Sequence, residues 1–222
     1  EKVQTFFEFV TRDGKFIYYR ANDVKPDSFA VYRYNVASGS SELIFSKDGY
    51  WYISDFQDDG RLILSRAITN TASEHFEWNP KTQELEPIIG QNEKEDYSVR
   101  YTASKGTYLV LSNKGTEFKR LYQWNKQVMK PVTGALKWDV ESFTVSPDRQ
   151  IVLYSVNEGG TTKTHALSGK TWKKIEFPEF PGADHVIAGA FSFDSQNVML
   201  GVVTATGPRV SYSYNFKTGL QT

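Results

Sequence analysis

The sequence predicts an all-β protein with the β-propeller fold, because two turn landmarks repeat along it and helical periodicity is missing. The first landmark is a turn between two β-like runs, and its glycines are spaced 46 residues apart. Its copies are Asp13-Gly14, Asp59-Gly60, Lys105-Gly106 and the degenerate pairs Asp148-Arg149 and Asp194-Ser195. The second landmark recurs at nearly the same spacing as the first and is, in most copies, an aromatic residue followed by Asn. Its copies are Tyr34-Asn35, Trp78-Asn79, Trp124-Asn125, Leu167-Ser168 and Tyr214-Asn215.

The second repeat shows how each unit is expected to form four strands. Its first strand alternates between apolar and polar residues, and Asp59-Gly60 then turns the chain because such turns need positive φ. The second strand is almost continuously apolar, which is typical of a strand buried on both faces. Pro87 predicts that the fourth strand lies at a sheet edge, where a missing N–H breaks no ladder bond. The expected strands are residues 52–56, 61–66, 75–79 and 85–89.

The other units follow the same order. The expected blades span approximately residues 3–46, 50–90, 97–133, 140–176 and 186–222. The expected strands are 6–10, 16–19, 31–35 and 43–45 in the first unit, 98–102, 108–112, 121–124 and 128–132 in the third, 142–145, 151–156, 164–167 and 172–175 in the fourth, and 188–193, 198–203 and 211–216 in the fifth.

The two ends of the chain predict an incomplete ring. The fifth unit only begins a fourth strand at residues 220–222, and the first unit starts directly on its first strand. Neither end has a spare strand that could close the ring. We therefore expect the 222 residues to be part of a larger propeller. Its two open sheet edges are expected to permit self-association.

Composition excludes several classes of protein. Lys and Arg together number 26, as do Asp and Glu, so the net charge is zero. The basic residues form no stripe, so the sequence does not predict nucleic-acid binding. There is no cysteine, which excludes disulfides and thiolate metal sites. No apolar run is long enough to predict a membrane span. Residues 1–4 do not form a signal peptide, and both an extracytoplasmic and a cytoplasmic location stay open.

The search for catalytic motifs assigns no catalytic, cofactor-binding or metal-binding residue. G-x-S-x-G and phosphate-binding loops are missing, and no metal-ligand spacing appears. His75 and His165 are expected at related positions of the third strand, as features of the repeat. His185 lies in a Pro/Gly-rich connection and is expected to be an exposed loop residue. The acidic cluster 92–96 is expected to be a solvated connection between units.

Paired carboxylates are an alternative site, because some five-bladed propellers are glycosidases. Two carboxylates facing one channel at the right separation would suffice for that chemistry. Their offsets from the turn differ, so nothing in the sequence sets their separation. The candidate acids on or next to first strands are Glu8, Asp55, Asp96, Glu141 and Asp184.

Several segments carry a family resemblance that covers essentially the whole chain. Ser146-Pro147-Asp148 resembles the S-P-D-G motif of TolB-like propellers. Residues 76–82 and 189–219 are similar to propeller blades of bacterial serine peptidases of the prolyl oligopeptidase family. All TolB-like propellers share these motifs, so their specificity is intermediate.

The resemblance implies a non-catalytic propeller that restricts access of short peptides to a C-terminal α/β-hydrolase domain outside this chain. That domain would carry the Ser-Asp-His triad, so no triad residue is carried over. Dipeptidyl-peptidase members use adjacent glutamates, and no Glu-Glu pair occurs here. Specificity of the acylaminoacyl-peptidase or oligopeptidase kind stays open. A stand-alone TolB-like module that binds protein or ligand is the main alternative, and a sugar-active propeller is a third.

Overall fold

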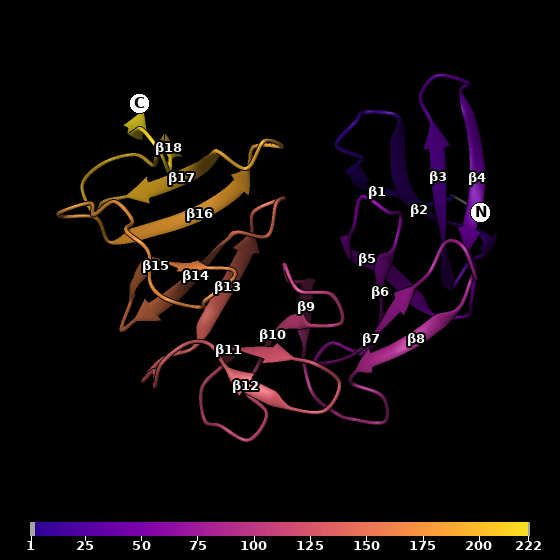
Figure 1. Cartoon of the computed structure of the whole chain (residues 1–222), viewed down its shortest axis with the longest axis horizontal. Coiled ribbons are helices and arrows are strands. Elements are labelled where there is room, and N and C mark those ends of the chain that lie inside the picture. Colours follow the sequence, from indigo (N-terminus) through magenta and orange to yellow (C-terminus); the bar gives the residue numbers. More distant parts are fainter. Residues whose placement is uncertain (1–2, 222) are drawn as a thin grey trace. The chain divides into compact units, whose positions relative to one another are not determined.

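The computed structural model describes residues 3–221, and every regular element in that range is a β-strand. The chain divides into two compact units, Glu1–Arg100 and Tyr101–Thr222, and each is described by itself (Figure 1). Antiparallel sheets with strands in chain order dominate both units. The expected all-β fold is therefore confirmed.

The first unit contains two four-stranded sheets. Their strands are β1 (Thr5–Val10), β2 (Phe16–Lys25), β3 (Ser28–Asn35) and β4 (Ser40–Phe45), then β5 (Tyr50–Phe56), β6 (Leu62–Thr69), β7 (Ala72–Trp78) and β8 (Leu85–Ile89). Pro87 lies in β8, which is an edge strand of its sheet as expected. Most strands begin at or before the expected residue, and β2 is longer than expected because it continues to Lys25 opposite Ser28.

The third sheet begins at the boundary between the two units. It consists of β9 (Ser98–Tyr101), β10 (Tyr108–Ser112), β11 (Arg120–Trp124) and β12 (Met129–Pro131). The remaining strands of the second unit form one seven-stranded sheet. They are β13 (Val140–Val145), β14 (Ile151–Glu158), β15 (Thr161–Ser168), β16 (His185–Phe191), β17 (Asn197–Val203), β18 (Val210–Asn215) and β19 (Gly219–Gln221).

Every copy of the first turn landmark contains a residue with positive φ. Positive φ angles of 69°, 87° and 72° occur at Gly14, Gly60 and Gly106. The degenerate copies Arg149 and Ser195 keep this conformation, with φ of 63° and 64°. Side chains repeat as well: the Ser146 hydroxyl donates to Asp148 Oδ1 at 2.6 Å, just as Ser192 donates to Asp194 at 2.6 Å.

The second landmark is a side-chain-capped turn. The Asn35 carboxamide oxygen accepts from the backbone N–H groups of residues 37 and 38, at 2.9 and 3.1 Å. Asn125 and Asn215 make the same pair of bonds two and three residues ahead. The Ser168 hydroxyl does so at longer distances of 3.4 and 3.3 Å. The Asn residues were expected as turn formers, and the structure confirms it.

The fourth sequence repeat departs from the expected pattern, because residues 172–175 do not form a strand. Only one isolated bridge joins Leu167 to Lys174. The chain then runs without regular structure to β16, which pairs in parallel with β15 at a single position, Thr162 opposite His185. Pro178 and Pro181 lie in this connection, and a proline cannot donate a ladder bond.

The fourth strand of the fifth sequence repeat is β19. It pairs with β18 from Asn215 opposite Gly219 to Ser213 opposite Gln221, and it is as short as β12. The expected strand at residues 220–222 is thus present as far as Gln221, while Thr222 lies outside the described residues.

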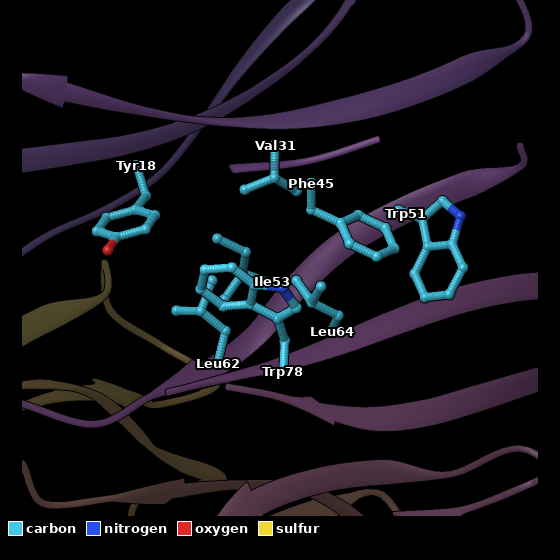
Figure 2. Packing of buried hydrophobic residues seen from close by; sticks show 8 residues of the cluster. All are labelled: Tyr18, Val31, Phe45, Trp51, Ile53, Leu62, Leu64 and Trp78. Carbon is cyan, nitrogen blue, oxygen red and sulfur yellow. The ribbon is translucent and has the colours of Figure 1, made fainter. Parts of the chain in front are cut away.

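Each unit has its own apolar core. In the first unit eight buried side chains from the first two sheets converge, as Figure 2 shows. They are Tyr18, Val31, Phe45, Trp51, Ile53, Leu62, Leu64 and Trp78. The second unit has two clusters, one around Leu109, Leu121 and Val152, and one around Leu153, Leu200 and Tyr214. None of the described residues belongs to a helix that could cross a membrane.

Candidate functional site

His75 lies at the centre of a buried polar network in the first unit. Its Nδ1 is 2.6 Å from Ser65 Oγ, and its Nε2 is 3.0 Å from the Tyr97 carbonyl oxygen. A carbonyl oxygen can only accept, so Nε2 carries the proton and Nδ1 accepts from the Ser65 hydroxyl. Ser54 Oγ lies 2.6 Å from Ser65 Oγ and continues the chain of hydroxyls.

This arrangement has the geometry of a nucleophile and its base, but no substrate can reach it. Ser65 and His75 are both 0% exposed. Burial lowers the pKa of His75 to about 4, against the weaker opposing effect of the Tyr97 carbonyl. The imidazole therefore stays neutral at physiological pH. The network joins β6 and β7 to the residue before β9, and its role is structural.

A similar connection occurs in the second unit, and it shows that His75 and His165 do not occupy equivalent positions of the third strand. There Ser155 Oγ is 2.8 Å from Thr164 Oγ1, whose hydroxyl donates to the Val186 carbonyl at 2.6 Å. Ser65 stands opposite His75, whereas Ser155 stands opposite Thr164. Thr164 is therefore the counterpart of His75. His165 is one residue further on, so it faces the other side of its sheet. The expected equivalence of His75 and His165 is wrong by one residue.

His165 and His185 lie close to one irregular region of the second unit. The His165 ring packs against Tyr154 at 5.1 Å between centroids. Burial, followed by the charge of Lys174, lowers its pKa. His185 was expected in an exposed loop, but it is the first residue of β16 and is half-buried. Its Nδ1 lies 3.0 Å from Thr162 Oγ1, because strand pairing extends further back than the local sequence predicts.

Among the candidate carboxylates, Glu8 forms an ion pair. Its Oε1 lies 3.1 Å from Arg20 Nε, and its Oε2 accepts from the Ile53 N–H at 3.3 Å. Burial raises the Glu8 pKa, while Arg20 and the Ile53 amide oppose that shift. The Arg20 guanidinium also lies 4.7 Å above the Phe6 ring and 4.9 Å above the Tyr50 ring. Glu8 thus balances the charge of Arg20, whose guanidinium lies against the rings of Phe6 and Tyr50.

Of the other four acids, Asp55 and Asp96 belong to the first unit, and Glu141 and Asp184 belong to the second. Asp55 is buried and accepts from the Phe56 N–H at 2.9 Å. Asp96 is half-buried within the expected connection at residues 92–96. The main chain of Asp184 pairs with Thr162 and Val203. Within residues 3–221 no group of three or more His, Asp or Glu side chains is placed to hold a metal ion.

Glu141 accepts from the Asn157 side-chain amide at 3.1 Å and lines a cavity of about 530 Å³. Trp138, which is 46% exposed, and Lys119 line the same cavity in the second unit. The cavity has an exposed aromatic face and polar groups, but it offers a single candidate acid from the set above.

The best-defined candidate site is a cavity of about 560 Å³ beside β15. Thr162, Thr164 and Ala166 of β15 line one side of it, and the 174–183 segment lines the other. Phe177 and Phe180 of that segment are held by ring contacts with Tyr214 and Tyr212, at 5.5 and 5.4 Å. Lys174 and Ile175, which were expected in the fourth strand of this repeat, line the cavity.

Sequence reasoning did not single out Thr164, Phe177 or Phe180. Pro178 and Pro181 indicate that the chain does not continue as a paired strand after residue 175.

Comparison with known proteins identifies the fold. No protein-family model matches the chain, and a search of curated proteins gave no match. The structure is similar over 98% of the chain to a prolyl endopeptidase, with a TM-score of 0.77 and 13% identity. TolB from Acinetobacter baumannii matches 98% of the chain with a TM-score of 0.61 and 18% identity. An oligogalacturonate lyase in complex with manganese matches 99% with a TM-score of 0.64 and 13% identity.

These likenesses confirm the TolB-like β-propeller fold that the turn motifs predicted. The chain spans 34% of the length of the prolyl endopeptidase, 56% of TolB and 77% of the lyase. At such low identities they establish the fold and leave activity to be argued separately.

Proposed function

We propose that this chain is the propeller part of a serine peptidase of the prolyl oligopeptidase type. In this proposal it limits access of substrates to a catalytic α/β-hydrolase domain elsewhere in the parent protein. The observation that carries the proposal is the likeness to the prolyl endopeptidase, which covers 98% of this chain and 34% of that one. The S-P-D turn, with Ser146 bonded to Asp148, is compatible with it, as with any TolB-like propeller.

The chemistry within the chain is compatible with this division of labour. The Ser65–His75 pair is fully buried and structural. Glu8 is engaged with Arg20. The proposal therefore assigns hydrolysis to the partner domain and substrate selection to the propeller.

The test uses the complete product of the reading frame that contains these residues. We expect it to hydrolyse short proline-containing peptides, to be blocked by a serine-directed inhibitor, and to leave folded proteins intact. The 222-residue chain by itself should show no hydrolysis. A complete product without peptidase activity, or one that degrades folded proteins equally fast, would refute the proposal.

A stand-alone TolB-like binding module is the second candidate, and the likeness to TolB over 98% of the chain favours it. It predicts that the complete product carries no G-x-S-x-G segment and instead retains protein or ligand partners. The sequence downstream of Thr222 separates the two candidates.

A further inference from the structure

We propose that the cavity beside Trp138 binds a neutral sugar chain built of pyranose rings with equatorial hydroxyls. One ring would stack on the indole, and its hydroxyls would bond to the polar side chains around it. The cavity has a volume of about 530 Å³, and small-molecule sites commonly have about 300–1,000 Å³. This inference does not depend on the proposed peptidase function, because the site lies within the second unit of the chain.

Trp138 supplies the aromatic face of the site. It lines the cavity and is 46% exposed. A Cβ placed on Gly159 would lie 3.7 Å from Cζ2 and Cη2 of the indole, so this part of the ring lies against the turn between β14 and β15. The ring is thus supported at one edge and accessible over much of its remaining surface. An accessible aromatic face in a cavity is a surface on which a ligand ring can stack.

A β-bulge places Glu141 in the same cavity. The pairing register of β13 with β14 shifts at Glu141, which is therefore an extra residue of β13. A bulge of this kind redirects a side chain out of the regular alternation. Glu141 Oε1 accepts from Asn157 Nδ2 at 3.1 Å, and Asn157 Oδ1 accepts from the Gly160 N–H at 2.8 Å. The first bond uses one carboxylate oxygen and one amide hydrogen, so each group keeps further bonding capacity for a ligand.

Asp139 is held in place by the loop before β11. Its Oδ1 accepts from the Lys119 N–H at 2.6 Å. The next residue, Val140, donates its N–H to the Lys119 carbonyl at 3.0 Å. These two bonds fix the segment that carries Trp138, although Trp138 and Asp139 are both exposed. A site whose side chains are already positioned loses less entropy when a ligand binds.

The mixture of an indole with carboxylates and an amide matches the chemistry of a neutral sugar. A pyranose ring with equatorial hydroxyls presents its C–H groups above and below, where they contact an aromatic face. Its hydroxyls both donate and accept hydrogen bonds. The carboxylates of Asp139 and Glu141 can accept from them, and the Asn157 amide and the indole N–H can donate to them.

Charge argues against two other classes of ligand that stack on tryptophan. The carboxylates of Asp139 and Glu141 repel anionic ligands such as nucleotides and uronic acid chains. Lys119 lines the same cavity and opposes the binding of an organic cation. A cation such as an alkylammonium group also has no acceptor for the N–H groups of Asn157 and the indole. A neutral ligand with many hydroxyls avoids both problems.

The experiment titrates the 222-residue chain with cellotetraose, a neutral chain of all-equatorial glucose units, and measures affinity by calorimetry. We expect a Kd of about 1 mM or tighter that does not change between about 0.05 and 0.5 M NaCl, because the ligand is uncharged. N-acetyl-lysine amide serves as the cationic comparison ligand. Absence of cellotetraose binding would overturn the proposal, as would tighter, salt-sensitive binding of the lysine derivative.

Aromatic substitutions locate the binding site. Trp138→Ala removes the stacking face and should weaken cellotetraose binding at least about tenfold, whereas Trp138→Phe retains a ring and should lose less affinity. Phe193→Ala is the matched control, because Phe193 is a 64% exposed aromatic residue of the same unit outside the lining of this cavity. We expect this control to bind like the unaltered chain. Equal affinity of Trp138→Ala and Phe193→Ala would refute the site.

Glu141→Gln tests the polar part of the site. The substitution keeps the shape of the side chain and one acceptor oxygen but removes the charge, and charge-assisted hydrogen bonds are about twice as strong as neutral ones. We expect cellotetraose affinity to fall by about threefold or more, with an unchanged thermal unfolding midpoint because Glu141 is exposed. Unchanged or increased affinity would contradict the proposed contact between Glu141 and the sugar.

Discussion

Glycine occupies three of the five first-landmark turns, yet all five positions have left-handed backbone. Arg149, with φ of 63°, therefore has a conformation that costs a non-glycine residue about 1 kcal/mol. Arg149→Gly and Arg149→Ala both remove the side chain, but only the glycine variant relieves the backbone. We expect the glycine variant to be more stable than the alanine variant by about 0.5–1 kcal/mol, measured by urea unfolding.

The converse substitution is Gly106→Ala. A Cβ added at Gly106 meets no atom within 4 Å, so the cost arises from its φ of 72° alone. This variant should lose about 1 kcal/mol. If Gly106→Ala were neutral, the turn would adopt another backbone and the repeated conformation would be incorrect.

His75 should make the stability of the first unit depend on pH. Its pKa is about 4 in the folded chain, below its ordinary value of 6.5, so the unfolded chain binds more protons between these values. The stability is complete above pH 6.5 and falls as the pH decreases towards 4, by about 3 kcal/mol in total. Urea unfolding at a series of pH values measures this slope.

His75→Thr is the matching variant, since Thr164 fills the equivalent position in the second unit. It should be less stable at neutral pH because a smaller side chain leaves a cavity. Its stability should nevertheless vary less between pH 6.5 and 4. The remaining slope includes His165, whose pKa is also lowered by burial. An unchanged slope would show that His75 is protonated in the folded chain or accessible to water.

At the scale of elements, β15 pairs with β14 along its whole length on one edge. Two other segments share its second edge: Ser168 N–H donates to Lys173, and Thr162 N–H donates to Asp184 just before β16. We expect both amides to be protected from hydrogen exchange in the free chain. Rapid exchange at either amide would contradict the pairing of β15 with that segment.

At the scale of the whole molecule, apolar packing between sheets stabilises the repeats. Leu64 is fully buried in the cluster shared by the first two sheets (Figure 2). Leu64→Ala should lower the free energy of unfolding by about 2–5 kcal/mol. Leu43, which is 50% exposed, is the control, and Leu43→Ala should change it by less than about 0.5 kcal/mol. Similar effects of the two substitutions would contradict the packing of this core.

The sequence was sufficient to predict the repeat, the turns and most strands. These features depend on bonds within a few residues, such as the Asn35 carboxamide capping its own turn. The candidate site was less predictable. Thr164 and Phe180 line one cavity because the chain leaves β15 after Ile175 and bonds to it again at Asp184. No local pattern encodes where that pairing stops.

The sequence by itself determined the β-propeller architecture, since turn chemistry and alternating hydrophobicity act locally and recur in every unit. Only the tertiary structure decided that residues 172–175 form no strand and that His75 is buried against Tyr97. It also decided that His165 faces the side of its sheet opposite to Thr164, the counterpart of His75. The physical reason is that strand pairing joins residues far apart in the chain. A one-residue difference in register reverses which face a side chain occupies.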